Sequence, residues 1–209
     1  MAISEKTTTS RREEIVNACE KLYRTMSFRE ITLKDISEET SFSRPSIYNY
    51  FATKEEIFLA LFEREYDRWN AELEGIYKGK QKLSVRALAE KLAKSLAARP
   101  QLLKLLAMNL YDMEANSRLE CLTHFKHSYG RALENMRRIL LKFRPEMTGN
   151  QIRDFIYAFF PFMFGVYPYT EVTEKQKKAM EQAGIDFELS SARELIFTFI
   201  YNYLNSQNV

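Results

Sequence analysis

The stretch "ETSFSRPSIYNYFATKEE", residues 39–56, combines aromatic rings, hydroxyl side chains, an arginine and a proline with few aliphatic residues. A helix buried in a core would instead carry an apolar stripe at helical spacing. Ser43 can cap a short helix that has Arg44 and Pro45 in its first turn, because the amide that proline lacks would be unpaired there anyway. We predict that this helix runs to about Asn49 and turns polar groups outward.

Two more helices are predicted ahead of it. Apolar residues recur at helical spacing from Ser10 to about Tyr23. Thr32 and Asp35 then form the start of a capping box for a short helix over about 33–39. Only "TSF" separates the two short helices, which is the spacing of a helix-turn-helix unit. In such a unit the second short helix enters the DNA major groove with its first residues at the base edges.

The residues of this second helix suit that task. Arg44 can pair with two acceptors of a guanine, and the hydroxyls of Ser43 and Ser46 suit bases or phosphates. Tyr48 and Tyr50, with the amide between them, can hold phosphate oxygens. The alternative is that the rings merely pack a small domain and that Arg44 is solvated.

The rest of the chain is also predicted to be helical. Six Gly and five Pro are few for 209 residues, which argues against an all-β sandwich. Helix starts are predicted at Thr53 with Glu56, at Ser84, at Pro100, at Ser117 with Glu120, and at Thr148 with Gln151. A last helix carries apolar residues from Leu195 to Leu204, and the polar stretch "TEKQKKAMEQAG", residues 173–184, is predicted to be a loop. We predict an all-α fold.

Composition places few limits on function. The net charge of +3 is small, and the first 54 residues hold nine Lys or Arg against eight Asp or Glu, so a DNA partner must be argued from placement. The two cysteines form no zinc spacing, and the amino terminus has no signal-peptide core, so we expect a cytoplasmic protein. The apolar run 155–169 is shorter than the roughly 20 residues that span a bilayer and contains two prolines.

The segment "FREITLKDISEETSFSRPSIYNYFATKEEIFLALFERE", residues 28–65, resembles the DNA-binding segment of the TetR family of bacterial transcriptional regulators. The matching positions are Thr32, Ile36, Ser43, Ile47, Tyr48, Tyr50, Phe51, Lys54 and Glu55. The chain departs from the family at Ser41, where glycine is usual, and at Phe42, where a smaller valine is favoured. By motif the resemblance covers about Ser10 to Glu65.

The resemblance implies a helix-turn-helix DNA-binding domain, residues 1–53, joined to a larger helical ligand-binding and dimerisation domain, residues 54–209. It implies DNA contacts at Thr32, Arg44, Ser46, Tyr48, Tyr50 and Lys54. With the residues argued above, the full predicted set is Thr32, Ser43, Arg44, Pro45, Ser46, Tyr48, Asn49, Tyr50 and Lys54. The implied function is that of a repressor released from a palindromic operator by a small molecule that tilts the helix from Thr53 to about Tyr77.

The resemblance also implies a homodimer. Two broad apolar stripes each need partners on more than one side, and a pair from each of two chains would make a four-helix interface. Alternatively, both stripes close the core of the single chain. The predicted interface residues are Ile152, Phe155, Ile156, Phe160, Leu195, Ile196, Phe199, Ile200 and Tyr203.

An apolar effector pocket is the third expectation. Large or adaptable side chains could line a cavity between helices, although such side chains are also ordinary core. The predicted lining is Tyr66, Trp69, Met108, Tyr111, Phe125, Tyr129, Phe159 and Met163.

Other classes of function find less support. Cys121, His124 and His127 would not converge on one metal ion from a helix, so we predict neither a metal nor a cofactor. The sequence contains none of the nucleophile-elbow, phosphate-loop or zinc-protease motifs of enzymes. A helix-turn-helix adaptor that binds protein rather than DNA stays open at this point.

Overall fold

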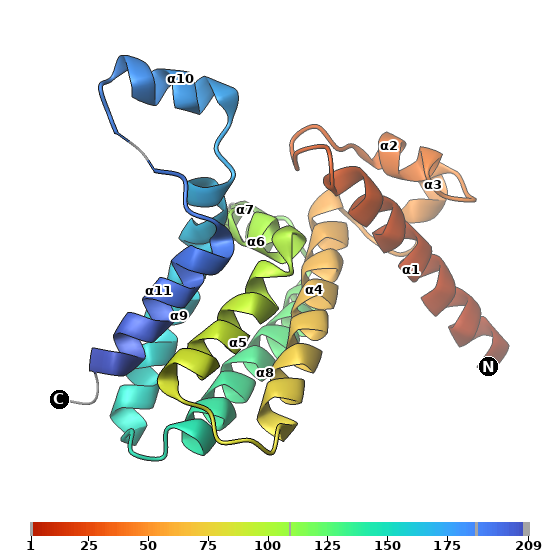
Figure 1. Cartoon of the computed structure of the whole chain (residues 1–209). Coiled ribbons are helices and arrows are strands. Elements are labelled where there is room, and N and C mark those ends of the chain that lie inside the picture. The colour runs from red at the N-terminus through yellow and green to blue at the C-terminus, as the bar shows by residue number, and fades with distance from the viewer. Residues whose placement is uncertain (1, 109, 187, 207–209) are drawn as a thin grey trace. The chain divides into compact units, whose positions relative to one another are not determined.

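The computed structural model describes residues 2–108, 110–186 and 188–206, with side chains from Ser10 onward. Within these residues all regular structure is helical, which confirms the predicted fold class (Figure 1). The helices are α1 Ala2–Tyr23, α2 Leu33–Glu38, α3 Arg44–Ile47, α4 Lys54–Lys78, α5 Val85–Ala97, α6 Pro100–Leu106, α7 Leu110–Ala115, α8 Leu119–Phe143, α9 Gly149–Thr170, α10 Glu174–Gln182 and α11 Ala192–Ser206. None of these helices is long and apolar enough to cross a membrane.

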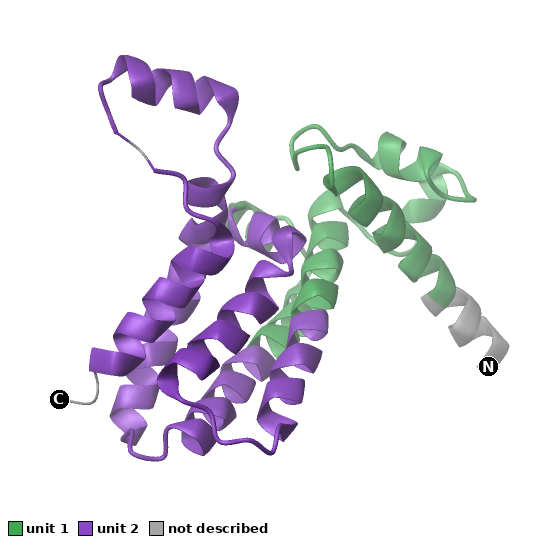
Figure 2. Cartoon of the chain, in the orientation of Figure 1, with its two compact units in different colours: residues 1–66, 108–129 green, residues 67–107, 130–209 purple. Residues whose placement is uncertain are grey.

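The chain divides into two compact units (Figure 2). Unit 1 comprises residues 1–66 and 108–129, and unit 2 comprises residues 67–107 and 130–209. Each of the long helices α4 and α8 therefore contributes one part to each unit. The sequence boundary predicted after Thr53 concerns functional domains and stays a prediction.

Unit 1 is built around the first part of α4. Phe58 of α4 is fully buried and receives the ring of Tyr23 from α1 edge-on, with centroids 5.1 Å apart. The ring of Phe28, in the loop before α2, meets Phe58 in the same way at 4.8 Å. Such edge-to-face contacts add to the hydrophobic burial of the rings. Ile36 of α2 and Ile47 of α3 are fully buried, which fixes the inner face of both short helices.

Unit 2 has a core of aromatic and aliphatic side chains. Trp69 of α4 is fully buried, and its indole nitrogen donates to the hydroxyl of Ser95 in α5 at 3.1 Å. Helices α9 and α11 lie side by side (Figure 1), and Phe162 stacks on Phe199 with ring centroids 4.2 Å apart. Helix α9 is continuous through Pro161 and begins with the predicted Thr148–Gln151 capping box.

Two helices, α10 in unit 2 and α8 at its start in unit 1, differ from what the sequence predicts. Residues 173–184 were predicted to be a loop, but α10 forms over Glu174–Gln182, with the Thr173 hydroxyl accepting from the Gln176 amide. Periodicity missed this helix because none of its residues is buried. Ser117 was predicted to cap α8, but its hydroxyl donates to the carbonyl of Met113, and α8 begins at Leu119.

Candidate nucleic-acid interface

The helix-turn-helix begins with the predicted cap of α2. The Thr32 hydroxyl accepts from the Asp35 amide at 3.3 Å, and the Asp35 carboxylate accepts from the Thr32 amide at 2.8 Å. This capping box satisfies two amides that the first turn of a helix leaves unpaired. Hydrogen bonds from the Thr32 hydroxyl and amide lower the pKa of Asp35, so its carboxylate stays ionised at the positive end of the helix.

The turn between α2 and α3 is held from α1. The Glu14 carboxylate accepts from the Ser41 amide and, at 3.1 Å, from the Ser41 hydroxyl. Among the described residues no side-chain-bearing residue has a positive φ, so Ser41 replaces the family's usual glycine without entering the left-handed region. Phe42 is half-buried beside Tyr50, with ring centroids 6.2 Å apart. These contacts keep the short turn compact.

Helix α3 turns most of the predicted DNA-contacting residues outward. Arg44 is exposed in its first turn, and half of the surface of Tyr48 is accessible. Ser43 occupies the cap position, but its hydroxyl makes no capping bond and lies 3.2 Å from that of Ser46. Ser43, Pro45 and Asn49 are exposed and Ser46 and Tyr50 are half-buried, while Thr32 is exposed at the start of α2. Apart from Thr32, these residues therefore lie on or directly beside one exposed short helix.

Phe51, in contrast, is core. Its ring is fully buried, and the guanidinium of Arg12 lies 4.7 Å from the ring centroid. For this residue the packing interpretation is correct.

Lys54 makes hydrogen bonds within unit 1. Its ammonium donates to the carbonyls of Phe28 and Ile31 at 2.7 and 2.8 Å and lies 4.2 Å from the centroid of the Phe28 ring. Burial lowers the pKa of Lys54, and the nearby carboxylate of Glu55 opposes that effect. Two of the three donors of this ammonium are thus occupied by the loop before α2.

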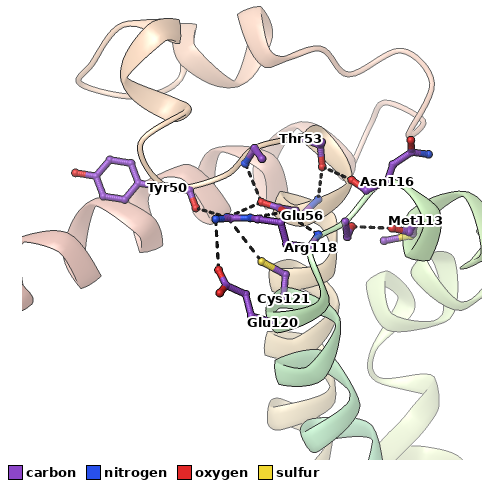
Figure 3. Close-up of polar contacts among 10 residues, drawn as sticks. Tyr50, Thr53, Glu56, Met113, Asn116, Arg118, Glu120 and Cys121 are labelled. Atoms are coloured by element: carbon purple, nitrogen blue, oxygen red, sulfur yellow. Dashed lines mark hydrogen bonds and ion pairs between the residues drawn. The ribbon is translucent and has the colours of Figure 1, made fainter.

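The pairing of Glu56 with Arg118 was not predicted from the sequence (Figure 3). The predicted Thr53–Glu56 box forms only in part: the Glu56 amide donates to the Thr53 hydroxyl at 3.2 Å, but the Glu56 carboxylate accepts from the amide of Ala52 at 2.7 Å. The same carboxylate also accepts from the amide, Nε and Nη2 of Arg118 at 3.0, 2.7 and 2.8 Å. No local sequence signal reports a partner 62 residues away.

Arg118 holds the buried carboxylate of Glu56 in its ionised form. Glu56 is fully buried, whereas 49% of the Arg118 side chain is exposed. Burial by itself would raise the pKa of Glu56, but the hydrogen bonds from Arg118 and Ala52 outweigh it and lower the pKa to about 2. The carboxylate is therefore ionised at neutral pH.

The residues of the predicted effector pocket fall into two groups. In unit 1, Tyr66, Phe125 and Tyr129 form an aromatic cluster with Phe62; the Tyr66 centroid lies 5.9 Å from that of Phe125 and 5.7 Å from that of Tyr129. In unit 2, Trp69, Phe159 and Met163 are fully buried. Met108 is half-buried, and 84% of Tyr111 is exposed.

The predicted dimer residues also divide by exposure. Six of them are buried within the single chain: Ile152, Phe155, Ile156, Phe160, Ile196 and Ile200. Leu195, Phe199 and Tyr203 of α11 are half-buried. Only the latter three offer surface to a second chain.

The histidines of α8 are both exposed, whereas Cys121 is buried. Within the described part of the chain, no group of three or more His, Cys, Asp or Glu residues is arranged to hold a metal ion.

Comparisons with known proteins agree with this geometry. Residues 15–61 match the family model described as bacterial regulatory proteins, tetR family, and residues 63–192 match the model described as the tetracyclin repressor-like C-terminal domain. An uncharacterized HTH-type transcriptional regulator, YfiR, of Bacillus subtilis (strain 168) is 37% identical over 57 residues, which is 27% of this chain. The chain spans only 28% of the length of that relative.

Solved structures share the fold over nearly the whole chain. FadR from Bacillus subtilis, in complex with stearoyl-CoA, has a TM-score of 0.60 at 16% identity, covering 91% of this chain and 96% of that one. PfmR from Thermus thermophilus has a TM-score of 0.60 at 14% identity, with coverages of 91% and 97%. A TetR-family regulator from Bordetella parapertussis 12822 has a TM-score of 0.59 at 15% identity, with coverages of 95% and 96%.

Proposed function

The chain belongs to the TetR family of bacterial regulatory proteins, and from this membership we propose that it is a repressor. Members of this family are DNA-binding transcriptional regulators rather than enzymes. In the proposal, a small apolar or aromatic ligand releases the protein from a palindromic operator. The observation that carries the proposal is the outward face of α3, where exposed Arg44, Tyr48 and Asn49 surround a helix anchored by buried Ile47. A short helix with this division of faces can enter the major groove while its inner side stays packed.

Each residue of the interface has a proposed part. Arg44 reads a guanine through two acceptors, with Ser43 and Ser46 beside it. Tyr48, Asn49 and Tyr50 hold phosphates and set the register of α3 on the duplex. Thr32, at the start of α2, contacts the DNA backbone. The ammonium of Lys54 donates its remaining proton to a phosphate, while its other two donors hold the loop before α2.

We propose that the active form is a homodimer. Two recognition helices must reach major-groove faces about 34–36 Å apart, which requires a second copy of α3. The half-buried side chains Leu195, Phe199 and Tyr203 support a contact through α11, with α9 beside it. The buried residues of α9 and α11 pack beneath this surface and hold the two helices in place.

The proposed effector is apolar or aromatic. Support comes from the cluster of Phe62, Tyr66, Phe125 and Tyr129, which offers ring faces and edges within one unit. The FadR structure, which holds stearoyl-CoA, is a case of this fold accommodating a long acyl chain. An effector that favours the non-binding arrangement by about 1–3 kcal/mol weakens operator binding about 5- to 150-fold.

Selection of bound duplexes from a random DNA library tests this function. The proposal predicts enriched sites with two-fold symmetry and a half-site spacing close to one helical turn. Recovery of no enriched sequence by the folded protein would contradict it and would favour the adaptor that binds protein. The enriched site then serves as the operator in the experiments below.

A further inference from the structure

The segment Tyr50–Thr53, called here the recognition linker, joins α3 to α4 and is held from the turn Asn116–Arg118 between α7 and α8 (Figure 3). The Thr53 hydroxyl donates to the Asn116 carbonyl at 2.9 Å. Arg118 Nη2 lies 3.5 Å from the Tyr50 carbonyl, at the limit of a hydrogen bond. Both segments lie within unit 1, although they are more than 60 residues apart in sequence.

The buried carboxylate of Glu56 is the strongest of these connections. It accepts from the Ala52 amide of the recognition linker and also from three nitrogens of Arg118. A fully buried carboxylate needs such donors, because removing one partner leaves an uncompensated buried charge. Glu56 thus ties the linker and the 116–118 turn to the same two oxygen atoms.

The 116–118 turn is itself fastened to α7. The Ser117 hydroxyl donates to the Met113 carbonyl at 2.7 Å, and the Asn116 side-chain amide donates to the Asp112 carbonyl at the same distance. A displacement of the start of α8 therefore moves a braced turn rather than a loose loop. The aromatic cluster of Tyr66, Phe125 and Tyr129 lies further along the same two helices, α4 and α8.

We propose that Arg118 is a positioning residue for the recognition helix: through Glu56 it fixes the recognition linker that follows α3. The inference rests on the proposed function, since it assigns a positioning residue to the same DNA-binding site. It places a determinant of operator affinity outside the helix-turn-helix, within residues 63–192 that match the C-terminal family model.

The test compares variants of the full chain. Arg118→Met breaks the ion pair, and the double variant Glu56→Leu with Arg118→Met removes both charges, which often restores the stability lost by breaking one partner. Arg118→Lys keeps the charge without the forked geometry. The matched control is Arg131→Met, which breaks the exposed pair that Arg131 of α8 makes with Asp67 of α4, away from the linker.

Two quantities are measured for each variant beside its melting temperature. The first is affinity for the selected operator. The second is amide hydrogen exchange of a peptide covering residues 48–56, compared with peptides from α1 and α2 of unit 1 and from α9 and α11 of unit 2. We expect Arg118→Met and the double variant to bind the operator about 5- to 150-fold more weakly and to exchange faster at 48–56. Arg118→Lys should fall between them and the wild type, and Arg131→Met should match the wild type.

The double variant separates positioning from stability. Recovery of the melting temperature without recovery of operator affinity or of protection at 48–56 supports the positioning role. Recovery of all three together would overturn it. If the melting temperature stays low, faster exchange confined to 48–56 supports the role, and equally faster exchange throughout unit 1 contradicts it. The exchange measurement needs no operator, so it decides this inference even where selection finds no DNA site.

Discussion

Lys54 is a residue whose position agrees with the family motif and whose environment adds a second role. Its side chain reaches back to the carbonyls of Phe28 and Ile31, so it links the start of α4 to the loop that precedes α2. The motif reveals the lysine, but those two partners follow from the path of the loop and carry no sequence signal. A charged group that donates to part-buried carbonyls contributes more to stability than a fully solvated one.

Replacing Lys54 with Met should therefore lower stability as well as DNA binding. Two carbonyls lose a charged donor, for which we expect a loss of about 1–3 kcal/mol in the free energy of unfolding, measured by denaturant titration. The salt dependence of operator binding checks the phosphate contact separately: its slope should fall by about one counterion. An unchanged slope with lower stability would leave Lys54 a purely internal role.

At the scale of elements, some local signals predicted the structure correctly, but the start of α8 at Ser117, helix α10 and the partners distant in sequence were not predicted. The boxes at Thr32 and Thr148 depend on residues three apart, and both are present. The box at Thr53 is incomplete because the Glu56 carboxylate accepts from Ala52 and from Arg118, and no pattern within α4 indicates the pairing with Arg118. Helix α10 was not predicted because none of its residues is buried, so no core-facing stripe marks it in the sequence.

We expect the stability of the fold to fall in acid when Glu56, at the start of α4, becomes protonated. Its pKa of about 2 lies below the usual 4.5, so the ionised form stabilises the fold at pH above 4.5 and that contribution is lost as pH falls from about 4.5 to about 2. Arg118 is the charged group that lowers this pKa, and the thiol of Cys121 also interacts with the Glu56 carboxylate.

Thermal melting of the wild type and of Glu56→Gln across this range measures the effect. We expect the wild type to be the more stable at neutral pH and the difference in unfolding free energy to shrink below pH 4.5. The other carboxylates titrate in both proteins and cancel in the comparison. A difference that stays constant down to pH 2 would contradict the assigned role of Glu56.

At the scale of the whole molecule, the sequence predicted the all-α class and the resemblance to the TetR family, but not which apolar residues stay exposed. A stripe along α9 or α11 looks the same whether it faces the core or a second chain. The structure buries Ile196 and Ile200 and leaves Leu195 and Phe199 half-exposed, a division that depends on how α11 packs.

Leu195→Glu should weaken the proposed dimer. A carboxylate at a contact surface is desolvated without a partner, while the position near the start of α11 lets the helix itself tolerate an acid. We expect sedimentation to show a shift from dimer to monomer, with weaker binding to the palindromic site. Ala71→Glu, at an exposed position of α4, is the matched control. A Leu195→Glu protein that stays dimeric would move the interface elsewhere.

The most direct test of the central claim, that α3 reads DNA sequence, is selection from the random duplex library by the wild type and by Arg44→Lys in parallel. The account predicts a two-fold symmetric site for the wild type. Because lysine keeps the charge but loses the fork, the variant should lose preference at one base pair in each half-site, at a cost of about 1–3 kcal/mol. Identical sites for both proteins would contradict reading by Arg44, and no enrichment for either would contradict sequence-specific binding altogether.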